Sequence, residues 1–197
     1  NEIRPALCGI HVKSEESRLI LYSSDGYTLC SFKMLCADDL SQWKAITVTV
    51  QLASVVQSID TSSFTVYQIN GGIGFAFDDG TVEGAVVSEE YPNIEGMLKQ
   101  HTPQETKVTV VPKAELKLAA KINSIYTNSE GKSMLLYADN IKVVAQTNND
   151  DFQCNGTTYF AEPSDGMTEP ALLSLNGRFL QSIVDVIDCD RIVLTFG

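Results

Sequence analysis

Two stretches of the sequence, far apart in the chain, follow the same order of apolar and polar residues. Val-Val-Gln-Ser-Ile-Asp at residues 55–60 and Ile-Val-Asp-Val-Ile-Asp at residues 183–188 are each followed by a three-residue link and an apolar run. Leu-Ile-Leu-Tyr at residues 19–22 similarly resembles Met-Leu-Leu-Tyr at residues 134–137, and both lead into a turn that contains Asp. Ordered self-similarity within a chain indicates repeated structural units. We therefore expect two domains that share one fold.

Short runs rich in β-branched and aromatic residues, separated by Asn-Gly-Gly and Asp-Asp-Gly turns, predict strands in both halves of the chain. Residues 52–59, 112–126 and 177–187 have helical periodicity, with Pro112 suited to a first helical turn and Asn176 to an N-cap. The sequence therefore predicts an α+β fold. The predicted strands are residues 9–13, 18–22, 27–34, 45–50, 63–70, 72–78, 81–88, 107–111, 132–138, 141–146, 157–161, 171–175 and 191–196.

The two copies of the repeat differ at their ends. We place the domains at residues 1–102 and 103–197, joined near His-Thr-Pro at residues 101–103. The second copy has a leading helix, at residues 112–126, for which the first has no counterpart. The first copy has trailing strands, at residues 72–88, for which the second has none. We expect each domain to be incomplete, in a chain that is part of a longer protein, with an exposed sheet edge or an uncovered core.

Charge and cysteine content limit the classes of function. The net charge is −11, from 25 acidic and 14 basic residues, which argues against a protein that coats nucleic acid with its whole surface. It permits a local basic strip. The cysteine count, five, is odd, and no Cys-x-x-Cys occurs, so neither a disulfide framework nor a zinc site is favoured. This cysteine usage favours a reduced compartment. No apolar run is long enough to span a membrane, and we expect a cytoplasmic protein.

No catalytic motif is present. Gly-Gly-Ile-Gly at residues 71–74 leads into another predicted strand, so it is not a dinucleotide fingerprint, and no P-loop, nucleophile elbow or His-Glu-x-x-His occurs. The acidic pairs fall at predicted turns or strand ends, which is typical of solvated loops. We expect no enzyme and no catalytic, cofactor-binding or metal-binding residues, the rival being a small α+β hydrolase whose site these motifs do not reveal. The pairs are Asp38-Asp39, Asp78-Asp79, Glu89-Glu90 and Asp150-Asp151.

One basic feature stands out from the acidic background. Lys113, Lys117 and Lys121 recur at every fourth residue of the helix predicted at 112–126. This spacing places three ammonium groups along one helix face. By itself the pattern is more typical of a solvated helix face, and the alternative is a strip that faces phosphates without reading bases.

Taken in order, these residues resemble the bacterial DNA polymerase III β subunit, the sliding clamp family. The family's middle domain has an Arg, then Leu-x-Gly, and these correspond to Arg4, Leu7 and Gly9. Its Thr-Asp-Gly-His-Arg-Leu turn corresponds to Ser-Asp-Gly-Tyr-Thr-Leu at residues 24–29. A Phe-Pro-Asp-Tyr segment matches Tyr-Pro-Asn-Ile at 91–94, and Phe-Asn-x-x-Tyr-Leu matches Leu-Asn-Gly-Arg-Phe-Leu at 175–180. The resemblance covers nearly the whole chain.

The resemblance implies a fold and a function. Family members have three repeated domains, each with two helices packed on small antiparallel sheets, and a head-to-tail homodimer closes a ring around duplex DNA. It implies a processivity factor that holds DNA independently of sequence and tethers polymerase and clamp loader, with no cofactor and no membrane. The alternative is a clamp-fold interaction module that does not encircle DNA. The DNA-facing residues that it implies are Lys113, Lys117, Lys121, Arg4 and Arg178.

In the family, a groove between the middle and last domains binds short peptides of polymerases and of the clamp loader. Apolar walls with a few backbone polar groups suit such peptides. Thr28 stands where the family usually has Arg, Tyr27 where it has His, and Gly96 where a basic residue is common, which indicates a divergent member. Carried over by position, the groove residues are Leu7, Ser24, Gly26, Tyr27, Thr28, Leu29, Pro92 and Met97.

Overall fold

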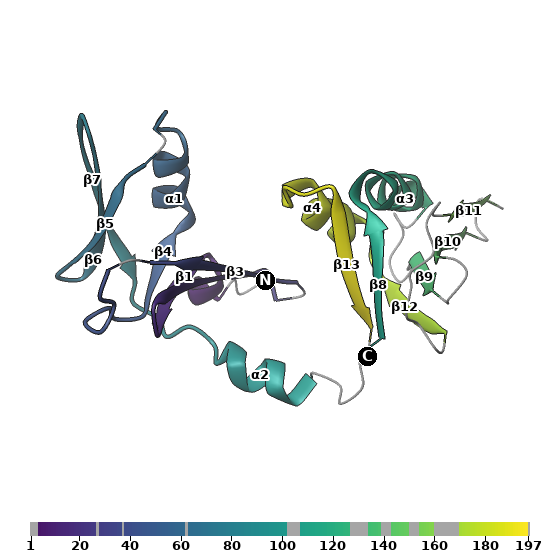
Figure 1. Cartoon of the computed structure of the whole chain (residues 1–197), viewed down its shortest axis with the longest axis horizontal. Coiled ribbons are helices and arrows are strands. Elements are labelled where there is room, and N and C mark those ends of the chain that lie inside the picture. The colour runs from purple at the N-terminus through teal and green to yellow at the C-terminus, as the bar shows by residue number, and fades with distance from the viewer. Residues whose placement is uncertain are drawn as a thin grey trace. The chain divides into compact units, whose positions relative to one another are not determined.

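The structure, a computed structural model, describes residues 4–26, 28–36, 38–61, 63–101, 107–126, 134–138, 143–149, 154–159 and 170–196 (Figure 1). The chain divides into two compact units, Asn1–Gly96 (unit 1) and Met97–Gly197 (unit 2), and each is described by itself. Both combine helices with antiparallel sheets, so the predicted α+β class is confirmed. Within the described ranges, no helix has the length and apolar character needed to cross a membrane.

Unit 1 is built on one seven-stranded antiparallel sheet in the order β3-β2-β1-β4-β7-β6-β5. The helix α1 follows β4 without a loop. A short 3-10 turn, η1, precedes β1. The elements are η1 (Pro5–Leu7), β1 (Gly9–Glu15), β2 (Arg18–Ser24), β3 (Leu29–Leu35), β4 (Ile46–Thr49), α1 (Val50–Gln57), β5 (Thr65–Ile69), β6 (Gly72–Phe77) and β7 (Gly80–Val87).

The start of α1 differs from the prediction. The prediction continued the strand through Val50 and began the helix at Leu52, whereas in the structure β4 ends at Thr49 and α1 begins at Val50. Thr49 is the N-cap, and its hydroxyl accepts a hydrogen bond from the Leu52 amide at 3.2 Å. Thr49 is β-branched, which favours a strand, and its hydroxyl can cap a helix. The helix therefore begins two residues earlier than the prediction placed it.

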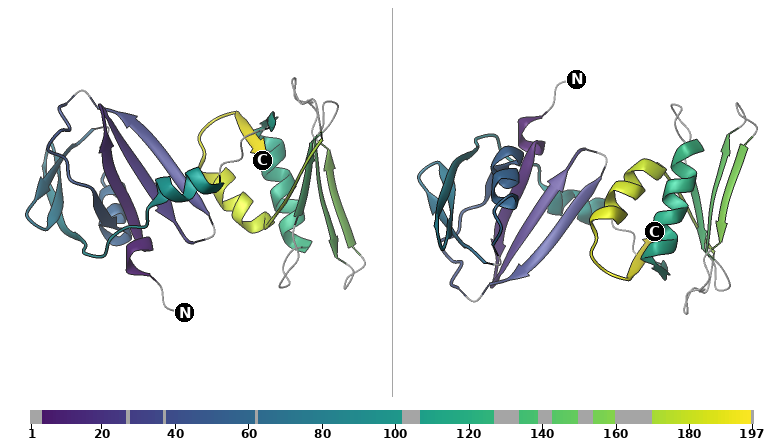
Figure 2. Two further views of the ribbon diagram at one scale, coloured as in Figure 1. Left: turned by 90° about the horizontal axis from the view of Figure 1, so that it is seen from below. Right: turned by 90° about the horizontal axis from the view of Figure 1, so that it is seen from above.

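Unit 2 contains a four-stranded sheet, β11-β10-β9-β12, and a two-stranded sheet, β13-β8. The helices α3 and α4 lie side by side (Figures 1 and 2). Asn176 caps α4 as predicted, because its side-chain oxygen accepts from the Arg178 amide at 2.9 Å. The elements are β8 (Lys107–Pro112), α3 (Lys113–Tyr126), β9 (Met134–Ala138), β10 (Val143–Asn149), β11 (Cys154–Tyr159), β12 (Ala171–Leu175), α4 (Gly177–Val186) and β13 (Arg191–Phe196).

A further helix, α2 (Ile94–His101), was not predicted. The Asn93 side-chain oxygen accepts a hydrogen bond from the Gly96 amide at 2.9 Å, which caps the helix start. Gly96 within the first turn weakens the helical signal, and the helix is short, so the apolar spacing of Ile94, Met97 and Leu98 did not identify it. The division between the two units falls inside α2.

The repeat inferred from sequence is present in the strand order, but the pairing of residues 19–22 with residues 134–137 is wrong, because these runs lie in β2 and β9, and the counterpart of β9 is β1. Counting along the chain, β3-β2-β1-β4 in unit 1 and β11-β10-β9-β12 in unit 2 have the same arrangement, and α1 and α4 follow β4 and β12, respectively. In unit 2 a second helix, α3, packs beside α4. Among the described residues of unit 1, α1 has no such neighbouring helix.

Candidate partner-binding surface and basic helix

An apolar cluster in unit 1 joins four segments that are distant in sequence. Ile20 and Tyr22 of β2 are buried together with residues from η1, from the loop after β7 and from the start of α2. Leu7 and Leu29, both predicted groove residues, are half-buried and pack against this core. The structure therefore brings these two residues to one apolar surface. The buried members of this Tyr91 cluster are Ala6, Ile20, Tyr22, Tyr91 and Ile94.

Sequence reasoning missed Tyr22 and Tyr91 as supports of this surface. Ile20 and Tyr22 are two residues apart and face the same side of β2, which alternation along the strand could have indicated. The backbone of η1 also contacts a residue that is distant in sequence, because the Ala6 amide donates a hydrogen bond to the Glu89 carboxylate at 2.9 Å. This hydrogen bond holds the residue next to Leu7 in place.

The turn between β2 and β3 is closed by its own side chains. The Ser24 hydroxyl donates to the Thr28 carbonyl at 2.7 Å, and it accepts from the Gly26 amide at 3.1 Å. The Asp25 carboxylate accepts from both the amide and the hydroxyl of Thr28, at 2.6 and 2.9 Å. Gly26 has a φ of 90°, a conformation that glycine adopts without a steric cost. Ser24, Gly26 and Thr28 thus belong to a hydrogen-bonded turn that leads into Leu29.

The remaining predicted groove residues lie in different surroundings. Pro92 is half-buried and lines a small pocket of about 300 Å³, together with His11 and Tyr22. Met97 lies on α2 and is 50% exposed. Tyr27 lies outside the described residues.

His11 supports the cluster from the neighbouring strand. Its ring stacks on Tyr91, with centroids 4.5 Å apart and planes at 10°, and its Nδ1 atom is 3.1 Å from the Thr47 hydroxyl. Burial lowers the pKa of the His11 imidazole below its ordinary value of 6.5, and the positive charge of Lys13 lowers it further. His11 is therefore a neutral, structural histidine at pH 7.

This pKa direction predicts that acid weakens unit 1. The stabilisation that neutral His11 provides is fully present above its unfolded pKa of about 6.5, and it is lost as the pH falls through the lower pKa of the folded state. We expect the urea midpoint of unfolding to fall between about pH 7 and pH 5. His11→Gln keeps a hydrogen-bonding side chain but does not titrate, so its midpoint should change less. An equal change in both proteins would contradict the assignment.

The three lysines of α3 are partly occupied by contacts to the rest of unit 2. The half-buried Lys113 ammonium donates to the Ile187 carbonyl, just after α4. Lys117 forms an ion pair with Asp185 of α4 at 2.7 Å, and Lys121 is exposed. The three lysines lie on one helix, as predicted. However, Lys117 contacts α4, and Lys113 contacts the residue that follows α4.

The other predicted basic residues are at the surface. Arg4 is exposed at the start of η1, and Arg178 is exposed in the first turn of α4. By contrast, α1 carries no charged residue at all, since its sequence is Val-Gln-Leu-Ala-Ser-Val-Val-Gln. Of the two helices that the repeat makes equivalent, only α4 therefore presents a basic group.

Comparison with known proteins identifies the fold. No family model and no curated protein matches the sequence. Solved sliding clamps do match: the clamp of Bacillus subtilis gives a TM-score of 0.84 at 17% identity, covering 100% of this chain and 52% of that one. The clamp of Pseudomonas aeruginosa gives 0.83 at 15% identity, covering 100% and 54%. The polymerase β subunit of Streptococcus pyogenes gives 0.82 at 16% identity, covering 100% and 53%.

The chain thus has the fold of a DNA sliding clamp. More specifically, it has the fold of about half of a bacterial DNA polymerase III β subunit, since it spans about half the length of the solved clamps that it matches. The resemblance drawn from the sequence motifs is confirmed at the level of the fold. In the described ranges, no group of three His, Cys, Asp or Glu side chains could hold a metal ion.

Proposed function

We propose that this chain is part of a sliding clamp, a processivity factor that encircles duplex DNA and tethers a polymerase and a clamp loader through short peptides. The observation that carries the proposal is the apolar surface of Leu7 and Leu29 on the Tyr91 cluster. The fold supports it, because the solved structures that the chain matches are titled as polymerase β subunits and sliding clamps. In the complete protein, the ring would be a homodimer.

The Tyr91 cluster has the chemistry expected of a peptide-binding surface. Its core is apolar and buried, while Leu7 and Leu29 remain half-exposed above it. Such surfaces bind the apolar side chains of a short peptide, and a few polar groups orient its backbone. The hydrogen bonds of Ser24 and Asp25 to Thr28 restrain the residue that precedes Leu29, so less conformational entropy would be lost on binding.

The proposed DNA contacts are weak and independent of sequence. A ring that slides needs contacts to phosphates, because hydrogen bonds to base edges would hold it at one position. Lys121 and Arg178 are exposed on the two neighbouring helices of unit 2. Lys117 would contribute only after exchange of its ion pair with Asp185.

We expect Lys121→Ala to weaken DNA binding in a salt-dependent manner. Loss of one phosphate contact should lower the slope of log affinity against log salt by about one. The measurement is a salt titration of the complete protein on duplex DNA of unrelated sequences, with Lys44→Ala, an exposed lysine in a loop of unit 1, as the matched control. An equal loss in the Lys44 variant would contradict the assignment.

Retention on circular DNA tests the encircling function itself. A clamp stays on closed circular DNA after loading and leaves when the DNA is cut, because its hold is topological. If the complete protein leaves circular and linear DNA at the same rate, the proposal that it encircles DNA is wrong. Failure to increase polymerase processivity would count against it in the same way.

A clamp-fold interaction module that does not encircle DNA is the second candidate. It is favoured by the uncharged α1, by the contacts that occupy Lys113 and Lys117, and by the net charge of −11. Long-range repulsion from so many carboxylates lowers affinity for DNA. Peptide binding without retention on circular DNA would support this candidate over the clamp.

A further inference from the structure

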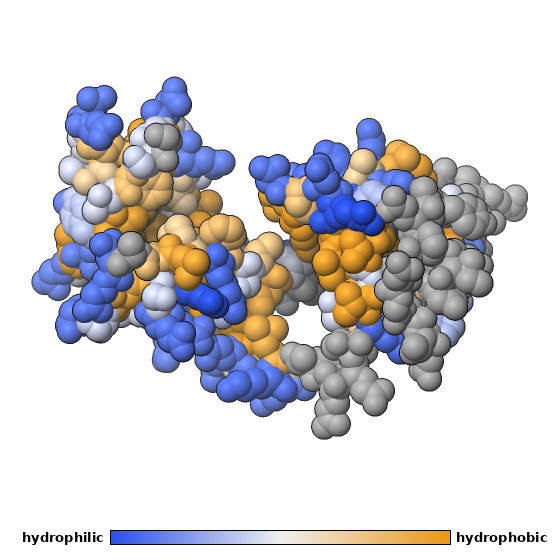
Figure 3. All heavy atoms as spheres, viewed as in Figure 1, coloured by the Kyte–Doolittle hydropathy of each residue, from blue (hydrophilic) through white to orange (hydrophobic). Residues whose placement is uncertain are grey.

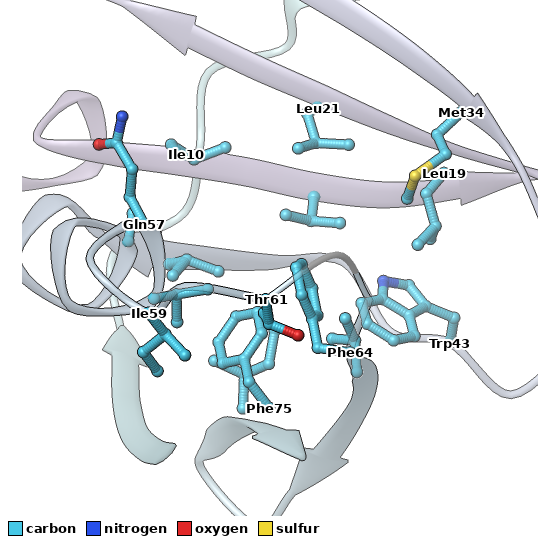
Figure 4. Close-up of a pocket in the computed structure, with 16 residues that line it drawn as sticks. Ile10, Leu19, Leu21, Met34, Trp43, Gln57, Ile59, Thr61, Phe64 and Phe75 are labelled. Carbon is cyan, nitrogen blue, oxygen red and sulfur yellow. The ribbon is translucent and has the colours of Figure 1, made fainter. Parts of the chain in front are cut away.

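The strands β1, β2 and β3 of unit 1 have different chemistry on their two faces. On one face, Leu19 and Leu21 of β2 and Met34 of β3 point into an apolar cavity of about 420 Å³, as Figure 4 shows. Val56 of α1 lines the same cavity, which reaches the surface at Phe64, a residue that is 48% exposed. Because successive side chains of a strand alternate between faces, the residues next to these in β2 and β3 belong to the opposite face.

The opposite face joins the Tyr91 cluster to two basic residues. Ile20 of that cluster is paired across the sheet with Lys33 of β3, so the two side chains point to the same side. Arg18 lies two residues before Ile20 on β2, and it points to this side as well. Leu29 lies four residues before Lys33 on β3 and packs against the cluster. The predicted peptide-binding residue Leu29 therefore shares one face with two cations.

Both of these cations are available to a ligand. Arg18 and Lys33 are exposed, and within the described part of the chain neither side chain forms an ion pair or a hydrogen bond. Glu15 is opposite Arg18 on β1, but no ion pair joins them. Lys13, on the same face of β1, is instead paired with Glu95 at the start of α2.

The charge of this face differs from that of the chain as a whole. The net charge is −11, which repels acidic ligands at long range. Two adjacent unpaired cations reverse this preference locally, so the face selects carboxylates at one place beside an apolar site. The surface of unit 1 that Figure 3 shows likewise has hydrophilic residues beside hydrophobic ones. Four residues of an extended strand span about 13 Å, which sets the separation of Leu29 and Lys33.

We propose that Arg18 and Lys33 bind an acidic flank of the partner peptides whose apolar side chains bind at Leu7 and Leu29. This inference rests on the peptide-binding function proposed above. The flank would carry one or two carboxylates about four extended residues from the apolar anchor of the peptide. Charge pairs at an exposed site are individually weak, so the apolar anchor supplies most of the affinity and the flank supplies selectivity among peptides.

Extended peptides test the proposed acidic flank. A peptide from the polymerase of the same organism is titrated with the complete protein by fluorescence anisotropy, unextended and with Gly-Ser-Gly-Asp-Asp or Gly-Ser-Gly-Lys-Lys added at either end. We expect the Asp extension at one of the two ends to strengthen binding by about fivefold at low salt, and the Lys extension to weaken it. The gain should vanish in about 1 M salt. Long-range repulsion by the acidic chain predicts the opposite order of the two extensions.

Charge reversal shows whether the contact is at this face. Lys33→Glu should abolish the gain from the Asp extension and transfer it to the Lys extension. Lys44→Glu makes the same change of charge at an exposed lysine, whose backbone bonds to Gln68 of β5 at the other end of the sheet, and it should keep the original order. The urea midpoint of each variant checks that unit 1 stays folded.

The outcomes separate this inference from the function on which it rests. If the unextended peptide binds but both extensions leave its affinity unchanged, or if the Lys extension binds better, the acidic flank is wrong and the peptide-binding function stands. The same conclusion follows if the Lys33 and Lys44 variants behave alike. If no form of the peptide binds, the peptide-binding function and this inference are both wrong.

Discussion

A Leu29→Asp substitution is expected to weaken the binding of partner peptides by about thirtyfold or more, which is the effect of losing one interface hot spot. Leu29 packs on the Tyr91 cluster directly after the hydrogen-bonded turn, so a carboxylate there would place a charge against the apolar side chains of the peptide. Peptides from the polymerase and the clamp loader of the same organism, titrated by fluorescence anisotropy, give the affinity.

Phe32→Asp is the matched control for this experiment. Phe32 lies on the same strand, is 63% exposed and is not part of the Tyr91 cluster, so the same chemical change there should leave the affinity unchanged. The urea midpoint of each variant separates loss of binding from loss of folding. Equal affinity of the Leu29 and Phe32 variants for the peptide would refute the assignment of Leu29 to the binding surface.

The largest effect on stability is expected from Gly9→Ala. A Cβ atom at Gly9 would lie 2.5 Å from the Val48 carbonyl oxygen and 2.8 Å from the Thr47 methyl carbon. Both contacts are in β4, which pairs with β1 at this position, so relief would require the two strands to separate. Overpacking of this kind costs about 1–3 kcal/mol. For a unit of this size, that lowers the melting temperature by about 4–8 °C for each kcal/mol.

Gly80→Ala provides the control for the glycine substitution. Gly80 begins β7, its φ is not in the left-handed region, and an added Cβ would meet no atom within 4 Å. We therefore expect its melting temperature to stay close to that of the unmodified protein. If Gly9→Ala melts at the same temperature as Gly80→Ala, the close approach of β1 and β4 does not constrain this position.

The elements that sequence predicted well have strong local signals. The spacing of Leu116, Ala119 and Ala120 identified α3, and Asn176 identified the start of α4. The short helix α2 was missed because a Gly in its first turn weakens the same signal. At Thr49 and Val50 the boundary was wrong because β-branched residues favour a strand while the Thr49 hydroxyl caps a helix.

For the candidate sites, too, the local motifs could be predicted from the sequence, whereas the contacts between distant segments could not. The motif around Leu7 and Gly9 and the turn before Leu29 were visible in the sequence, but the core that unites them was not. Tyr91 and Ile94 come from the other end of unit 1, and the bond between Ala6 and Glu89 joins residues that are 83 positions apart. The lysine spacing on α3 was also visible, whereas the contacts of Lys113 and Lys117 depend on α4.

By itself, the sequence determined that the chain is an α+β protein with an internal repeat, because periodicity and turn residues act over a few positions and are written in order along the chain. Its motifs also pointed to the clamp fold. Only the tertiary structure decided which side chains share a surface. It placed Leu7 and Leu29 on one core, gave two lysines of α3 partners near α4, and left Val56 beside an open cavity. These outcomes depend on contacts between segments distant in sequence, which no local pattern specifies.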